Sequence, residues 1–113
     1  MGSHTFQATI GGKGLTAAKA YEGLVAEAER EYGTDPYNGT ISTTTGFVMV
    51  DIGRRRVNNI ITDILEDDRH EIRKWGPAGC IALKGAWLTR WRKRNGLAGT
   101  RAKAYVFFGH AVS

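Results

Sequence analysis

The chain has 113 residues, 42% of them hydrophobic and 24% charged, which is typical of a soluble globular protein and excludes a disordered one. Its formal net charge of +5 at pH 7 favours an anionic partner. The apolar runs are strand-sized and fall short of the roughly 18–20 residues that a membrane helix needs, so we expect no membrane partner.

The length indicates a single domain over residues 1–113, with residues 1–4 vector-derived or disordered. Cys80 is the only cysteine, which excludes an intramolecular disulfide and favours a reducing compartment. No charged segment followed by an apolar one opens the chain, so no secretory signal is evident. We therefore expect a cytoplasmic protein.

The first expected elements are a strand and a helix. Apolar and polar residues alternate over residues 5–10, which is the period of a half-buried strand. After a glycine-rich turn, Thr16 can cap a helix whose apolar residues recur at helical spacing. Gly33 is then a typical left-handed C-terminal cap.

The middle of the chain predicts a turn, a strand and a second helix. Residues 34–40 are turn-forming, and residues 41–50, rich in Thr and Val, indicate a strand. A helix then opens at residues 51–53 and keeps its apolar pattern to Leu65. The arginine run of residues 54–56 would lie at the positive end of this helix's dipole, which is unfavourable. Either the helix begins later or the arginines bind an anion.

The last third predicts two strands that flank a short helix. Residues 74–79 indicate a turn, residues 80–83 and 102–112 two strands, and residues 87–95 a short helix. The order of elements predicts an α+β fold. We expect a single four-stranded, mostly antiparallel sheet with two main helices packed on one face, plus the short helix near residues 87–95.

Basic residues are concentrated in the second part of the chain. Residues 72–113 hold nine Lys and Arg and no acidic residue, whereas residues 1–71 hold seven basic and eleven acidic residues. The segment 84–103 alone holds seven of the basic residues and two of the three Trp. Lys and Arg release counterions from phosphates, and aromatic faces stack on unpaired bases. The alternative is that these Trp residues pack on the sheet while the charges only face water.

The predicted nucleic-acid-binding residues come from this segment and from the arginine run. They are Lys84, Trp87, Arg90, Trp91, Arg92, Lys93, Arg94, Arg101, Lys103, Arg54, Arg55 and Arg56.

A second candidate site is the glycine-rich turn before the first helix, where backbone N–H groups favour an anion. Its predicted ligand-binding residues, with one from the later turn, are Gly12, Lys13, Gly14, Thr16 and Asn38. The turn matches neither the Walker motif nor the G-x-G-x-x-G fingerprint, so a simple strand-to-helix connection is the alternative. The hydroxyl groups near residues 40–45 likewise predict either a small polar pocket or only the solvated face of a strand.

The sequence indicates no catalytic residue, no metal and no cofactor. His4, His70 and His110 are dispersed, and only the carboxylates near His70 offer local metal ligands. Cys80 would need a histidine partner to act as a nucleophile, and a buried structural thiol is the alternative. Binding is therefore favoured over enzymatic turnover.

Four short segments resemble a known group of proteins. They are Glu31-Tyr32-Gly33, Asp35-Pro36-Tyr37-Asn38-Gly39-Thr40, Lys74-Trp75-Gly76-Pro77-Ala78-Gly79 and Phe107-Phe108-Gly109. Together these segments, about twenty residues, are similar to short uncharacterised proteins of phages and other mobile elements. The resemblance implies no fold, catalytic residue or cofactor. It implies a small accessory protein of the host cytoplasm, a class that includes anti-defence inhibitors such as anti-CRISPRs, which act by binding.

Three functions follow as hypotheses. The first is a small basic, non-enzymatic module that binds nucleic acid or a nucleoprotein complex. The second is a protein–protein inhibitor or a homo-oligomer, in which the Trp-bearing segment meets an acidic protein surface or a second copy. The third is a nucleotide or small-ligand binder, or an enzyme, at the glycine-rich turn.

Overall fold

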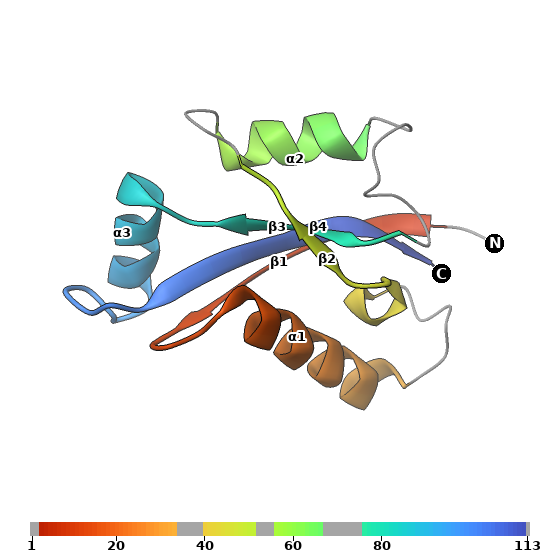
Figure 1. Ribbon diagram of the computed structural model, residues 1–113, viewed down its shortest axis with the longest axis horizontal. Helices are drawn as coiled ribbons and strands as arrows, with labels where there is room; N and C mark the ends of the chain where they lie inside the picture. Colours follow the sequence, from red (N-terminus) through yellow and green to blue (C-terminus); the bar gives the residue numbers. More distant parts are fainter. Residues whose placement is uncertain (1–2, 34–39, 52–55, 67–75, 113) are drawn as a thin grey trace.

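The computed structural model describes residues 3–33, 40–51, 56–66 and 76–112. Within these ranges the strands form one sheet of order β1-β4-β3-β2, in which β4 is antiparallel to β1 and β3, while β2 is parallel to β3 (Figure 1). The strands are β1 (Ser3–Gly12), β2 (Phe47–Met49), β3 (Ala78–Ala82) and β4 (Lys103–Val112). The predicted α+β fold with a four-stranded, mostly antiparallel sheet is confirmed.

The long pair of β1 and β4 forms one side of the sheet. Its register runs from Ser3 opposite Val112 to Gly12 opposite Lys103. Between them, the apolar residues of β1 are half-buried and the alternating polar ones are exposed, as the period-2 pattern predicted. One face of β1 is therefore polar and open to solvent.

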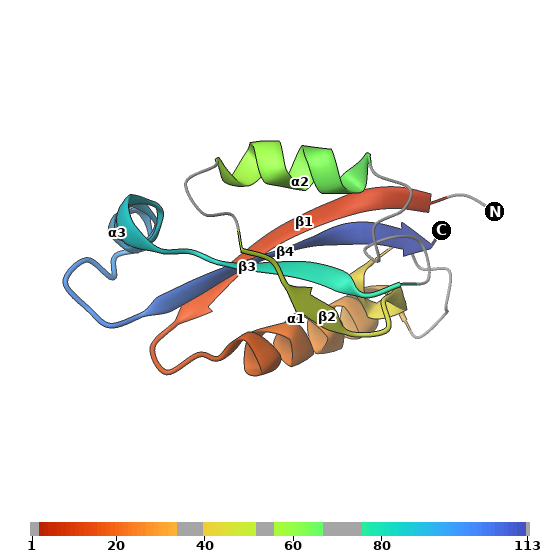
Figure 2. The same cartoon turned by 45° about the horizontal axis from the view of Figure 1, so that its top comes forward.

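The helices α1 (Ala17–Tyr32) and α2 (Val57–Leu65) cover opposite faces of the sheet, as Figure 2 shows. Tyr105 and Phe107 of β4 belong to the core beneath α1, whereas Val106 and Phe108 belong to the core beneath α2. The prediction that both main helices pack on one face is therefore wrong. Because successive residues of a strand point to opposite faces, the unbroken apolar run in β4 requires a cover on each side.

The first end of α1 follows the predicted capping pattern, whereas Gly33 at the other end has a φ of 82° with a ψ of −174° and so does not adopt the predicted left-handed helical cap. The side chain of Thr16 accepts a hydrogen bond from the backbone N–H of Lys19 at 3.2 Å, and the N–H of Gly33 donates to the Glu29 carbonyl at 2.8 Å. The first predicted helix is confirmed.

Within the described ranges no helix is long and apolar enough to cross a membrane.

The strand predicted over residues 41–50 is wrong in its first half. Those residues form a 3-10 helix, η1 (Ile41–Thr43), and only β2 pairs with β3. The cause is local, because the Thr44 hydroxyl donates to the backbone carbonyl of Ile41 at 2.6 Å and so favours a turn over a ladder. The hydroxyl of Tyr21 lies 2.6 Å from the same Thr44 oxygen and fixes this turn to α1.

The second helix begins later than predicted, at Val57. Arg56 precedes it with an extended backbone (φ −74°, ψ 139°). Of the two alternatives for the arginine run, a later start of the helix therefore applies to Arg56. Arg54 and Arg55 lie outside the described residues. Val57, Ile60 and Ile61 pack α2 onto the sheet, and the first turn of α2 lies toward the end of the sheet that carries the third helix (Figure 1).

Candidate functional site

The short helix α3 (Gly85–Arg94) lies at one end of the molecule and connects β3 to β4 (Figure 1). It begins at Gly85, whose φ of 55° falls in the left-handed region that favours glycine. At its other end the side-chain amide of Asn95 donates to the carbonyl of Trp91 at 2.7 Å, and Gly96 follows with a φ of 70°. The short helix predicted near residues 87–95 is confirmed.

Exposed cations gather around α3. They are Lys84, Arg90, Lys93, Arg94, Arg101 and Lys103. Because Gly12 lies opposite Lys103 in the register, the loop that carries the exposed Lys13 reaches the same place. Residues 76–112 contain no Asp or Glu. We call these seven cations the basic end.

Several acidic side chains lie toward the opposite end of the molecule, whereas Asp51 lines a hollow together with Lys84 and Trp87. Both α1 and α2 run away from α3 in Figure 1, and their last turns carry the exposed Glu29, Glu31, Asp63 and Glu66. The molecule is elongated, with extents of 45 × 31 × 19 Å. Apart from Asp51, the charge asymmetry of these described residues is therefore also a separation in space, which favours a positive potential at the end that carries α3.

Trp91 anchors α3 to the sheet. Its indole lies against the backbone of Gly11 in β1, and a Cβ added there would stand 2.6 Å from Cζ2 of the ring and 2.6 Å from the carbonyl oxygen of Lys103. Only glycine leaves room for this contact. The sequence left two roles open for the Trp pair, stacking on bases or packing on the sheet. Packing on the sheet therefore fits Trp91.

Trp87, one helical turn earlier, is 38% exposed. The guanidinium carbon of Arg90 lies 5.3 Å from the centroid of its ring, which is within the range of a cation–π interaction. Because its ring is exposed beside a cation whereas Trp91 is packed, Trp87 is the aromatic candidate for contact with a ligand.

Arg92 differs from the other basic residues of α3. It is half-buried, and its Nε donates to the carbonyl oxygen of Ala102 at 2.7 Å. This bond holds the end of α3 to the residue that precedes β4. Among the predicted contact residues, Arg92 therefore stabilises the fold, whereas Arg90, Lys93 and Arg94 are exposed to solvent.

An open groove of about 460 Å³ separates α3 from the start of α2, over the polar face of β1. The polar residues that line it are Gln7, Thr9, Asn58, Arg94 and Asn95. Trp87 and Trp91 form its aromatic side. Its volume lies within the roughly 300–1,000 Å³ of typical ligand sites.

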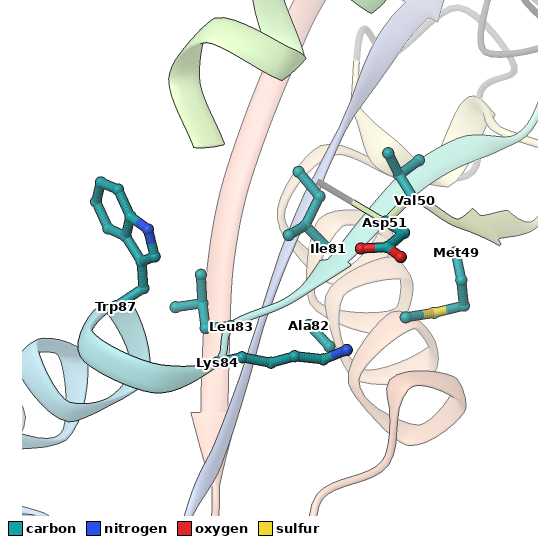
Figure 3. Close-up of a pocket in the computed structure, with 8 residues that line it drawn as sticks. All are labelled: Met49, Val50, Asp51, Ile81, Ala82, Leu83, Lys84 and Trp87. Carbon is teal, nitrogen blue, oxygen red and sulfur yellow. The ribbon is translucent and has the colours of Figure 1, made fainter. Parts of the chain in front are cut away.

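A second hollow, of about 260 Å³, lies at the edge of the sheet and is shown in Figure 3. β2 pairs only with residues 78–80, so Ala82 at the end of β3 extends past it. Met49 and Trp87 both line this hollow and are the large hydrophobic residues that stay exposed within the described ranges, at 55% and 38%. Lys84 reaches across it in Figure 3.

The structure explains most residues of the glycine-rich turn without a ligand. Gly11 accommodates Trp91, Gly14 has a φ of 69°, and the Thr16 side chain caps α1. Tyr105 also donates its hydroxyl to the carbonyl of Leu15 at 3.0 Å, which fastens the turn to β4. Of the predicted ligand residues, Lys13 belongs to the basic end, Gly12 lies opposite Lys103 in the register, and Asn38 lies outside the described residues.

Cys80 is a buried structural thiol. Its side chain is fully buried in the core beneath α1, and burial raises its pKa from 9.0 to about 12, which disfavours the reactive thiolate. His110 is occupied elsewhere, with Nε2 at 3.0 Å from the carbonyl oxygen of Leu65. Among the described residues no three His, Cys, Asp or Glu are grouped to hold a metal ion, and His70 lies outside those ranges.

Sequence reasoning missed the polar wall of the groove. Gln7 and Thr9 stand on the polar face of the first strand, which the alternation of residues 5–10 already marked as exposed. Asn58 and Asn95 gave no signal, because their relation to β1 depends on where α2 and α3 pack, respectively.

No family model, no curated protein and no solved structure matches the chain. Its function is therefore inferred from its own residues.

Proposed function

We propose that the protein is a small basic module that binds nucleic acid, or the nucleic-acid part of a nucleoprotein complex, through the basic end. The observation that carries the proposal is the exposed indole of Trp87 among exposed cations. Residues 76–112, which supply six of the seven cations of the basic end, contain no acidic residue, and Asp51 of the neighbouring hollow is an acid close to Trp87. Cations attract the phosphates, and an exposed aromatic ring adds contact with bases.

The proposal is one of binding without turnover. In the described part of the chain the lone cysteine is buried, and no metal-binding cluster is present. The resemblance of about twenty residues to phage and mobile-element proteins supports an accessory role in the host cytoplasm. Within that role we propose interference with a host defence complex, in the manner of anti-CRISPR proteins, as the biological purpose.

The test compares a triple variant of the basic end with a double control variant on α1. In the first, Arg90, Lys93 and Arg94 are replaced by Ala, and Arg92 is kept because it holds the fold. In the control, Lys19 and Arg30, which are exposed on α1, are replaced by Ala. Fluorescence anisotropy with labelled DNA and RNA at several salt concentrations gives the affinity and its salt dependence.

We expect the triple variant to bind at least ten-fold more weakly at low salt. The slope of log affinity against log salt should also flatten, by about 0.7 for each single-strand phosphate that is no longer neutralised, or by about 0.9 for each duplex phosphate. The α1 control should keep wild-type affinity. Equal affinities of wild type and triple variant would refute the proposal.

A protein partner is the second candidate, and a specific observation favours it. Met49 and Trp87 expose apolar surface in the hollow at the sheet edge, where β3 continues past β2. Exposed apolar patches beside an open strand edge suit an added strand of another protein or of a second copy. A complex that survives nuclease and high salt during purification, and that Met49→Asp abolishes, would establish this candidate.

A further inference from the structure

The groove between α2 and α3 is lined by aromatic, polar and aliphatic side chains, the last being those of Val57, Leu83 and Val106. On the α3 side stand the indoles of Trp87 and Trp91, with Arg94 beside them. On the other sides stand the carboxamides of Gln7 from β1 and Asn58 from α2. An aromatic surface facing amide groups is the combination that recognises a planar heterocycle with polar edges.

The amide groups are available for such recognition. Within the described residues, no hydrogen bond holds the side chains of Gln7 and Asn58, and both residues are exposed. Asn95 uses its amide nitrogen on the carbonyl of Trp91, which leaves its carbonyl oxygen as an acceptor toward the groove. Carboxamides present a donor and an acceptor together, as the edges of the bases do.

The aromatic wall is held in place before any ligand arrives. Trp91 rests on the backbone of Gly11, and Arg92 fixes the end of α3 to Ala102. A rigid wall lowers the ordering cost of binding. Arg94 lines the groove from α3, and Arg56 directly precedes α2; both are exposed, so phosphates can be held on either side.

We infer that the ligand is single-stranded, and that an unpaired base enters this groove while its flanking phosphates contact the basic end. The inference rests on the proposed function and gives it a substrate class. A duplex keeps its bases stacked inside, so a hollow between two helices cannot receive them. A single strand can turn a base outward and stack it on an aromatic side chain.

The experiment compares a single-stranded oligonucleotide of about 16 nucleotides with the same sequence in a blunt duplex, as both RNA and DNA. The variants are Trp87→Ala and Asn58→Ala. Asn59→Ala is the matched control, because Asn59 is the exposed neighbour on α2 that does not line the groove. Circular dichroism confirms that each variant is folded.

We expect the wild type to prefer the single strand. Trp87→Ala should weaken single-strand binding about ten-fold or more, since one base stacked on an aromatic ring is worth that much, and Asn58→Ala should weaken it less. The loss caused by Trp87→Ala should be larger for the single strand than for the duplex, and Asn59→Ala should keep wild-type affinity for both.

Two other results have different meanings. Equal affinity for single strand and duplex, with Trp87→Ala and Asn58→Ala silent, would overturn this inference and leave the proposed function standing. Binding to neither oligonucleotide at low salt would overturn the proposed function and this inference with it.

Discussion

Trp91 and Gly11 form a contact that joins α3 to the end of β1, because the ring of one occupies the space that a side chain on the other would need. The two residues are eighty positions apart in the chain, and their contact fixes the helix that carries three of the seven cations of the basic end, Arg90, Lys93 and Arg94. The position of the basic end therefore depends on a glycine in the opposite half of the sequence.

Replacing Gly11 with Ala should lower the free energy of unfolding by about 1–3 kcal/mol, which is the usual cost of forcing extra volume into a packed site. The added methyl group would meet both the indole and the Lys103 carbonyl. Urea denaturation measures the change. Gly12→Ala is the control, because nothing lies within 4 Å of a Cβ at Gly12, and it should be neutral or slightly stabilising. Equal stabilities of the two variants would show that Trp91 does not rest on Gly11.

Arg92 should affect stability where its neighbour Lys93 does not. Arg92→Ala removes the bond from Nε to the Ala102 carbonyl, and a hydrogen bond from a charged group contributes about 1.5–3 kcal/mol. Arg92→Lys should recover little of this, because a lysine side chain has no donor at the position of Nε. Lys93 is exposed, so Lys93→Ala should change the free energy of unfolding by less than about 0.5 kcal/mol. Similar urea midpoints for the Ala variants at 92 and 93 would contradict this assignment.

Local periodicity in the sequence is sufficient to predict most of the elements but not their arrangement. The alternation of residues 5–10, the cap at Thr16 and the short helix near residues 87–95 depend on neighbours in the chain, and all are confirmed. The faces that α1 and α2 cover depend on β4, whose alternate residues are apolar on both sides. The apolar run of β4 indicates that both faces of the sheet are covered, so the predicted arrangement with both helices on one face was wrong.

The candidate site shows the same division. The clustering of exposed cations follows directly from the composition of residues 84–103. The groove does not, because Gln7, Asn58 and Trp87 meet only after β1, α2 and α3 have been placed by long-range packing. The sequence does not distinguish Trp87 from Trp91. In the structure Trp91 packs against Gly11, whereas the ring of Trp87 is exposed.

The hydroxyl of Tyr105 should contribute measurably to stability. It donates to the carbonyl oxygen of Leu15 across ninety residues of sequence. This bond links the turn before α1 to β4. Tyr105→Phe removes this bond with little change in shape, so we expect a loss of about 1 kcal/mol in the free energy of unfolding. Thermal denaturation measures it. A variant as stable as the wild type would mean that water replaces the hydroxyl at Leu15 without cost.

The last prediction concerns the buried thiol of Cys80 at high pH. Burial raises its pKa from 9.0 to about 12, so between these values the unfolded chain loses the thiol proton while the folded chain keeps it. Fewer protons bound in the unfolded state mean that stability falls as pH rises. This group alone should lower the free energy of unfolding by about 1.4 kcal/mol for each pH unit within that window.

Cys80→Ala removes this titration and leaves the other titrating groups unchanged. Urea denaturation of wild type and variant from about pH 8 to about pH 10.5 should therefore give two curves that converge as pH rises, because only the wild type has the thiol contribution. Below about pH 8 the difference between them should be constant and set by the lost side-chain volume. Curves that stay parallel across the whole range would show that Cys80 ionises as easily in the folded protein as in the unfolded chain, and a thiol reagent would then label the native protein without urea.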